Sequence, residues 1–269
     1  MCPNCRAFIT TDDKVCPYCQ AQVGPRAVER RSTADAMGGL IPHARFTTVV
    51  IMLINTGLYI ATILVSSRSG NGGGIDPDGQ TLVLFGAKFA PLISQGQWWR
   101  LITAGFLHGG ILHILMNMWV LFDLGAQVEE VCGTSRFLTI YLFTNITGFL
   151  ASYYFLDPRV PSIGASAAIF GLIGGMIGVG VRDRTSYGAA IRKFFTRWAI
   201  YGLVLSLIPG TDIAAHAGGL AGGFVVGFIA GTPSYSAAVE RVWQLAAGVM
   251  LAITGYAFFD MIKYMLHAT

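Results

Sequence analysis

The chain consists mainly of long apolar blocks that alternate with short polar connections from residue 46 onward. An α-helix rises about 1.5 Å per residue, so about 20 apolar residues cross a hydrocarbon core roughly 30 Å thick. The blocks therefore predict seven transmembrane helices and an all-α polytopic membrane protein. The predicted helices cover about residues 46–65, 110–126, 136–156, 164–181, 194–208, 213–230 and 242–265.

The first 45 residues lack such a block and are polar or mixed in character. We expect no cleavable signal peptide here, because such a peptide contains an apolar core. Residues 23–45 have the character of a basic linker, and four arginines lie just before the first apolar block. By the positive-inside rule, this charge predicts a cytoplasmic N-terminus. The arginines are Arg26, Arg30, Arg31 and Arg45.

A second cluster of basic residues supports the same topology. It follows the fourth predicted helix, and the loop that carries it is therefore expected in the cytoplasm. With the N-terminus on that side, the second, fourth and sixth helices begin at the outer face. The cluster comprises Arg182, Arg184, Arg192, Lys193 and Arg197.

Composition agrees with this class of protein. Hydrophobic residues make up 54% of the chain and charged residues 12%, with a formal net charge of +4. The mean hydropathy is +0.59. A soluble domain usually has about 25% charged residues, so this chain has too few to cover a water-facing surface. We expect the lipid bilayer as its environment and no nucleic-acid partner, because basic stretches interleaved with aromatic residues are missing from the sequence.

Four of the five cysteines lie within the first 19 residues, as the pairs Cys2/Cys5 and Cys16/Cys19. Two Cys-x-x-Cys pairs suit tetrahedral Zn²⁺, although two disulfides or unpaired thiols are alternatives. The segment has almost no apolar core, and a metal would supply its folding free energy. The pattern predicts a zinc ribbon over residues 1–22 with a structural Zn²⁺. Thiolate ligands favour a reducing compartment, and such a module can also dock a protein partner.

Polar side chains recur near the outer ends of three predicted helices. His113 and Asn117 are four residues apart on the second helix and so share a face. Ser166 opens the fourth helix, and His216 lies near the start of the sixth. Taken singly, each has a structural interpretation: a helix cap for the serine, or an interhelical hydrogen bond for the others. Their common depth on separate helices favours one functional site.

Glycine spacing predicts that the fourth and sixth helices pack closely. Small residues four apart let helix backbones approach in lipid, which would bring Ser166 and His216 within reach of each other. A neutral imidazole can activate a serine hydroxyl, and the resulting oxyanion needs hydrogen-bond donors. His113, Asn117 and the backbone N–H of Ser166 can supply them. No carboxylate is available at this depth to orient the imidazole. Close packing without chemistry is the alternative.

These residues make the chain resemble the rhomboid family of intramembrane serine proteases from about residue 46 to residue 230. The matching motifs are Trp99-Arg100, His113-x-x-x-Asn117, Gly164-x-Ser166 and His216-x-x-Gly219-x-x-x-Gly223. The resemblance implies Ser166 as nucleophile, His216 as base, and an oxyanion site of His113, Asn117 and the Ser166 amide. It also implies that catalysis needs no cofactor. The implied substrates are transmembrane proteins, cut near the outer end of their helices.

The resemblance assigns further roles and shows two departures. His108 would support the site, and Glu129 would be a structural acidic residue. The first loop and the fifth helix are implied gates. Phe170 replaces a tyrosine that packs on the catalytic histidine in some members. A seventh helix follows the catalytic core, where six-helix members end.

We therefore expect a zinc ribbon (1–22), a basic cytoplasmic linker (23–45), a six-helix catalytic core (46–232) and a seventh transmembrane helix (233–269). The predicted function is that of an intramembrane serine endopeptidase acting through an acyl-enzyme. A catalytically silent relative that binds transmembrane segments is the first alternative. A transporter is the second, but the inverted repeats or broken helices typical of that class are not evident.

Overall fold

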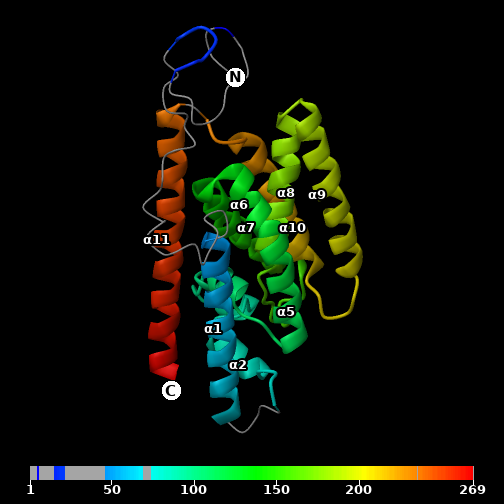
Figure 1. The fold of residues 1–269 in the computed structure, drawn as a ribbon. Coiled ribbons are helices and arrows are strands. Elements are labelled where there is room, and N and C mark those ends of the chain that lie inside the picture. The colour runs from blue at the N-terminus through cyan, green and yellow to red at the C-terminus, as the bar shows by residue number, and fades with distance from the viewer. Residues whose placement is uncertain (1–4, 6–14, 22–45, 69–73, 235, 269) are drawn as a thin grey trace. The chain divides into compact units, whose positions relative to one another are not determined.

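The computed structural model of the protein describes residues 5, 15–21, 46–68, 74–234 and 236–268 (Figure 1). The chain divides into two compact units, residues 1–43 and 44–269. Cys2, most of the predicted zinc ribbon and the predicted linker over residues 23–45 lie outside the described residues.

The described part of the second unit is helical, with a single isolated antiparallel bridge between Lys88 and Ser162. A π-helical turn, η5 (Leu121–Gly125), joins α5 to α6, so these two helices form one continuous rod. The long elements are α1 (Phe46–Arg68), α5 (Ile111–Val120), α6 (Ala126–Cys132), α7 (Thr134–Phe155), α8 (Ser166–Arg182), α9 (Ser186–Leu205), α10 (Ile213–Ala230) and α11 (Ala237–Ala268). The short elements are α2 (Gly79–Leu84), α3 (Ala90–Ser94), α4 (Arg100–Thr103) and the 3-10 turn η4 (Ala104–Phe106).

Each of the seven predicted transmembrane segments corresponds to a helix or to the α5–α6 rod. Among the described residues, four helical segments are both long and apolar enough to cross a bilayer, which makes this an integral membrane protein. The helix α8 is apolar but shorter than these. The four segments are Phe46–Arg68, Ile111–Cys132, Ile213–Ala230 and Ala237–His267.

The fifth helix begins earlier than its apolar pattern predicts. We expected it from about residue 194, but α9 begins at Ser186. The side chain of Thr185 caps this start by accepting a hydrogen bond from the backbone N–H of Gly188 at 3.3 Å. The first part of α9 therefore includes Arg192 and Lys193 of the basic cluster, which are exposed. A good cap and exposed cations are compatible with a helix that begins outside the apolar region.

The close packing predicted for the fourth and sixth helices is confirmed, since α10 packs along α8 (Figure 1). A Cβ atom at Gly219 would collide with the carbonyl oxygen of Ala167, and one at Gly223 with the carbonyl oxygen of Gly171. Glycine is therefore required at these positions for the two backbones to meet. A neighbouring face of α10, with Gly218 and Gly222, packs on α7. This arrangement places α10 between two neighbours and sets the position of His216.

Glu129 has a structural role at the start of α1. Its buried carboxylate accepts hydrogen bonds from the backbone N–H groups of Thr47 at 3.2 Å and Thr48 at 3.1 Å. It also accepts a hydrogen bond from the Thr48 hydroxyl at 3.0 Å. A carboxylate is favourable at a helix N-terminus, where backbone N–H groups lack partners. Glu129 thus fastens the start of α1 to α6.

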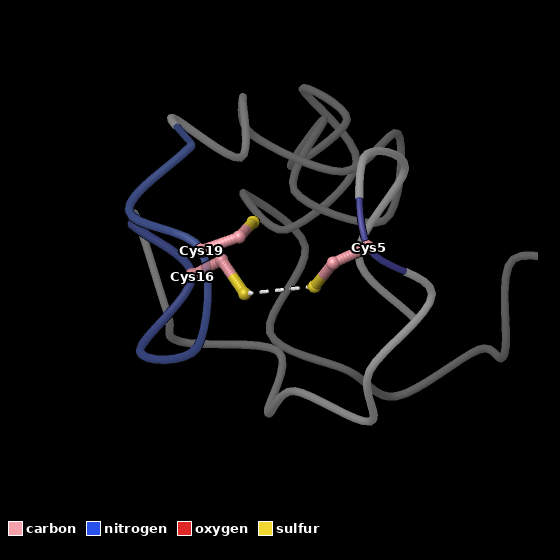
Figure 2. Close-up of side chains that lie close together, drawn as sticks. All are labelled: Cys5, Cys16 and Cys19. Atoms are coloured by element: carbon pink, nitrogen blue, oxygen red, sulfur yellow. Dashed lines mark hydrogen bonds between the residues drawn. The ribbon is translucent and has the colours of Figure 1, made fainter.

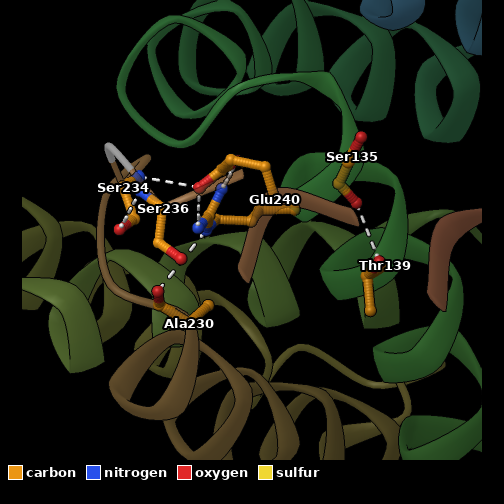
Figure 3. A network of polar contacts seen from close by, with 7 residues as sticks. Ser135, Thr139, Ala230, Ser234, Ser236 and Glu240 are labelled. Carbon is orange, nitrogen blue, oxygen red and sulfur yellow. Dashed lines mark hydrogen bonds and ion pairs between the residues drawn. The ribbon is translucent and has the colours of Figure 1, made fainter. Parts of the chain in front are cut away.

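An ion pair fastens the beginning of α11 to the core. The buried Arg136 on α7 donates two hydrogen bonds to the carboxylate of Glu240, at 2.7 and 2.8 Å. Arg136 also donates to the carbonyl of Ala230 at 3.4 Å, and the backbone N–H of Ser234 donates to Glu240 at 2.7 Å (Figure 3). Because Ala230 ends α10, this network joins three helices.

Aromatic contacts fasten the other half of α11. Tyr264 lies against Trp99, with ring centroids 5.8 Å apart, and Phe258 packs edge-on against Phe106 at 5.2 Å. The guanidinium of Arg100 lies 5.1 Å from the centre of the Tyr264 ring. The seventh helix is therefore integrated with the segment around α4 and η4.

Arg100 lies within the segment between α1 and α5 and connects several parts of that segment. Its guanidinium is fully buried and donates to the carbonyl oxygens of Val83 at 2.6 Å and Ala87 at 3.1 Å. It also donates to the side-chain oxygen of Gln97 at 2.7 Å. A planar guanidinium satisfies several fixed acceptors at once, which ties the end of α2 to α4. In this structure the Trp99-Arg100 motif is a fold element away from the site.

Candidate active site

Ser166 is the first residue of α8 and follows a turn that requires glycine. Gly164 has φ +128°, a conformation rarely adopted by residues with a side chain. Its backbone N–H donates to the carbonyl of Ala104 at 3.0 Å, which holds the turn against η4. The residue that caps α8, Ala165, has no side chain able to cap it. Ser166 thus does not have the helix-cap role that its sequence position allows, and its hydroxyl has a different partner.

That partner is His216 on α10. The Nε2 atom of His216 lies 2.8 Å from the Ser166 hydroxyl oxygen, which is hydrogen-bonding distance. Phe170, one turn beyond Ser166 on α8, stacks on the imidazole with centroids 4.4 Å apart and an interplanar angle of 20°. His216 is only 8% exposed. The pair is thus formed in a largely dry setting, where hydrogen bonds to charge are strong.

His113 reaches the same point from α5. A Cβ atom added to Gly164 would lie 2.7 Å from His113 Nε2 and 3.4 Å from the Ser166 hydroxyl oxygen. A side chain at Gly164 would therefore collide with His113, and glycine lets His113 and Ser166 both lie close to the turn. Three helices, α5, α8 and α10, therefore contribute polar atoms around one glycine.

Asn117 and His108 complete the buried polar groups near this point. Asn117 lies one turn after His113, is 7% exposed, and its Nδ2 forms no hydrogen bond with any described residue. The ring of His108 packs edge-on against that of His113 at 5.1 Å. A buried donor without a partner costs free energy, so an unpaired amide beside a polar space suits a ligand oxygen.

One contact in the site was not predicted from the sequence. The hydroxyl of Ser206, the residue after α9, lies 2.6 Å from Nδ1 of His216. The sequence predicts no carboxylate at this depth to orient the imidazole, and in the structure a hydroxyl takes that place. A serine at the end of one apolar helix, ten residues before a histidine in the next, was the available signal.

The described cysteines of the first unit form a cluster. The sulfur atoms of Cys5, Cys16 and Cys19 all lie within 4.8 Å of one another (Figure 2). Those of Cys5 and Cys16 are 3.7 Å apart, far longer than a disulfide bond of about 2.05 Å. In a tetrahedral zinc site with Zn–S bonds of about 2.3 Å, neighbouring sulfurs lie about 3.8 Å apart. The three sulfurs therefore fit three corners of such a site.

Fold and site together define a helical integral membrane protein in which a half-buried serine on one helix lies against a buried histidine on another. The family model for the Rhomboid domain matches residues 95–233, just over half of the 269 residues. The chain belongs to the rhomboid family, and the resemblance predicted from its motifs is confirmed at this level.

Similar proteins occur in bacteria, plants and protozoa. "Rhomboid protease GluP" of Bacillus subtilis is 38% identical over 192 residues, which are 71% of this chain and 37% of that protein. "RHOMBOID-like protein 4" of Arabidopsis thaliana is 36% identical over 58% of this chain and 40% of that protein. "Rhomboid-like protease 1" of Toxoplasma gondii is 29% identical over 91% of this chain and 89% of that protein. The chain thus spans less than half the length of the first two.

Proposed function

We propose that this protein is an intramembrane serine endopeptidase that cleaves transmembrane proteins through Ser166 and His216. The observation that carries the proposal is the 2.8 Å contact between the Ser166 hydroxyl oxygen and His216 Nε2. A nucleophile within hydrogen-bond reach of a base is the minimal geometry for covalent acyl transfer. Relatives named as rhomboid proteases support the same activity.

The reaction follows from the positions of these groups. The Ser166 oxygen attacks the peptide carbonyl while His216 Nε2 takes its proton, and the imidazolium then protonates the leaving amine. This leaves an acyl-enzyme on Ser166. Water, deprotonated by His216, attacks the ester and releases the second product. The pair requires no metal or organic cofactor for any of these steps.

The tetrahedral oxyanion needs donors that are already in place. We assign this role to the unpaired Nδ2 of Asn117, to His113, and to the backbone N–H of Ser166 at the positive end of α8. The substrate carbonyl oxygen would lie beside Gly164, close to His113 Nε2 and the Ser166 hydroxyl oxygen. His108 supports His113 through ring packing and does not touch the substrate.

Topology determines where the substrate is cut. The arginines before α1 and the basic cluster after α8 favour a cytoplasmic N-terminus. Ser166 at the start of α8 and His216 near the start of α10 then lie toward the outer face of the bilayer. The substrates are transmembrane helices cleaved near their outer ends.

The first unit is assigned a structural Zn²⁺. Cys5, Cys16 and Cys19 supply three thiolates of suitable spacing, and Cys2, which lies outside the described residues, is assigned as the fourth. A site with four protein ligands is closed to substrate, so the metal would stabilise this segment and take no part in cleavage. A protein partner of the ribbon is compatible with this role.

The test is cleavage of a model transmembrane substrate in liposomes by the full chain. Ser166→Ala and His216→Ala are each expected to abolish cleavage, whereas Ser67→Ala on α1 and His267→Ala on α11 retain it. Both controls are exposed and lie away from the site. Cleavage that persists in Ser166→Ala would contradict the serine mechanism. A wild-type protein that binds transmembrane segments but cuts none would favour the catalytically silent alternative.

A further inference from the structure

The base of the site has a hydrogen-bond partner on its far side. Ser206 Oγ lies 2.6 Å from His216 Nδ1, and the same oxygen lies 2.7 Å from the carbonyl oxygen of Gly202. Ser206 is only 5% exposed. Its hydroxyl is therefore confined between two fixed polar atoms.

The hydroxyl has one proton, and this limits the arrangement of hydrogen bonds. The carbonyl of Gly202, which also accepts from the backbone N–H of Ser206 at 2.9 Å, can only accept, so its hydrogen bond with the hydroxyl uses the Ser206 proton. Toward His216 the Ser206 oxygen must then act as acceptor, which requires a proton on Nδ1. In a neutral imidazole the proton on Nδ1 leaves Nε2 as a bare acceptor. That nitrogen is the one 2.8 Å from the Ser166 hydroxyl.

The opposite tautomer is unproductive. With the proton on Nε2, the imidazole would donate to Ser166 and could not accept its proton. Ser206 would then have to donate to Nδ1, and the Gly202 carbonyl would keep only its hydrogen bond from the backbone N–H of Ser206. The geometry thus favours the tautomer that can act as a base, and it also favours a single ring orientation.

The end of α9 is itself held in place, which makes Ser206 a fixed acceptor. The Thr211 hydroxyl donates to the carbonyl of Ser206. Asp212, the N-cap of α10, accepts from the backbone N–H of Ala215 at 2.9 Å and contacts the Ser152 hydroxyl on α7. The connection between α9 and α10 is therefore braced one turn before His216.

We infer that Ser206 is a positioning residue that holds His216 in the tautomer and orientation needed to activate Ser166. This inference rests on the proposed serine protease function and deepens it. Ser206 touches neither the substrate nor the reacting atoms, and a neutral hydroxyl here takes the place usually given to a carboxylate. The charge that develops on His216 during the reaction is stabilised by the same Ser206 oxygen.

The kinetic test compares Ser206→Ala with Ser206→Thr and with wild type. Loss of one neutral hydrogen bond corresponds to a roughly five- to tenfold effect, expected in kcat with KM unchanged. Ser206→Thr keeps the hydroxyl and should restore most of the rate. Ser67→Ala is a matched control, because Ser67 makes the same type of hydrogen bond to the carbonyl of Ile63, at 2.8 Å, without a histidine nearby.

A second readout does not depend on turnover. In protein with ¹⁵N-labelled histidine, the ring nitrogens of His216 are assigned by their loss in His216→Ala. We expect a proton on Nδ1 in wild type and a mixture of tautomers in Ser206→Ala. The rate at which a fluorophosphonate probe labels Ser166 should fall in parallel with kcat.

The outcomes separate this inference from the proposed function. If Ser166 and His216 are required for cleavage but Ser206→Ala changes neither kcat nor the His216 tautomer, the inference is wrong and the function stands. If wild type neither cleaves nor reacts with the probe, the proposed function fails first. An equal loss of activity in Ser206→Thr and Ser206→Ala, with an unaltered tautomer, would also overturn the role in positioning.

Discussion

Phe170 lies nearly parallel to the imidazole of His216, with ring centroids 4.4 Å apart. The two residues come from different helices, α8 and α10, and Phe170 is one turn from Ser166, the proposed nucleophile, on α8. The stacked aromatic ring restricts tilting of the imidazole out of its plane. The hydrogen bond between Ser206 Oγ and His216 Nδ1, at 2.6 Å, restricts the imidazole further at its edge.

Removing the stacked ring of Phe170 should lower the rate of catalysis. Stacked aromatic pairs contribute about 0.5–1.5 kcal/mol, so Phe170→Leu is expected to lower kcat about two- to tenfold. Phe170→Tyr keeps the ring and should remain active. Phe137→Leu is the control, because Phe137 is equally buried and stacks on Tyr141 instead of a histidine. A similar fall in kcat in both leucine variants would show that only general packing is involved.

Glu129→Gln should weaken the attachment of α1. The glutamine keeps one acceptor oxygen but loses the charge that faces the backbone N–H groups of Thr47 and Thr48. Hydrogen bonds to charged groups contribute about 1.5–3 kcal/mol, and we expect a loss of unfolding free energy in this range. Denaturant titration in detergent micelles measures it. Glu130→Gln, at the exposed neighbouring position, should have no such effect, and an equal loss there would contradict the capping role.

Glu240→Gln should loosen the seventh helix. The substitution removes the charge partner of Arg136, whose side chain is 1% exposed, and leaves a buried cation without an ionic partner. We expect faster limited proteolysis of the connection between α10 and α11 and a lower midpoint of thermal unfolding. Arg241→Gln, the exposed neighbour, should behave as wild type. Unchanged proteolysis in Glu240→Gln would mean that the aromatic contacts of Tyr264 and Phe258 suffice to dock α11.

Asp78 should make stability depend on pH in the acid range. It caps α2, and hydrogen bonds from Thr81 first and Ser66 second lower the pKa of its carboxyl from 3.8 to about 2. A group whose pKa is lowered by folding contributes stability above its unfolded pKa and loses it as pH falls through the folded value. The difference in thermal midpoint between wild type and Asp78→Asn should be at its full size above about pH 5. It should shrink as the pH falls toward about 2. A constant difference over this range would contradict the assignment.

Metal analysis of the purified chain should find about one Zn²⁺ per molecule, as a closed four-thiolate site binds one ion. Cys19→Ser should lower this content by removing one ligand. Cys132→Ser should leave it unchanged, because Cys132 is buried on α6 with its sulfur 3.6 Å from that of Met176. Full zinc content in Cys19→Ser would exclude the proposed ligand set.

Much of the membrane-embedded fold could be predicted from the sequence, because it depends on local properties. Apolar blocks long enough to span a bilayer mark the helices, and glycines four apart mark the face on which α8 and α10 meet. Gly219 and Gly223 do contact the α8 backbone as this spacing requires. The residue types of Ser166, His216, His113 and Asn117 and their common depth in the bilayer predict the candidate site. The motifs that contain them also predict membership of the family.

The contacts that complete the site were decided by tertiary structure. Ser206 reaches His216 only because α9 ends where the connection to α10 folds back, and no periodic pattern encodes that turn. The docking of α11 depends likewise on Arg136 and Glu240, 104 residues apart in sequence. Sequence periodicity shows which face of a helix is apolar, but not which neighbour that face meets. Lipid and protein are equally apolar partners, so the choice between them rests on shape and on a few buried polar pairs.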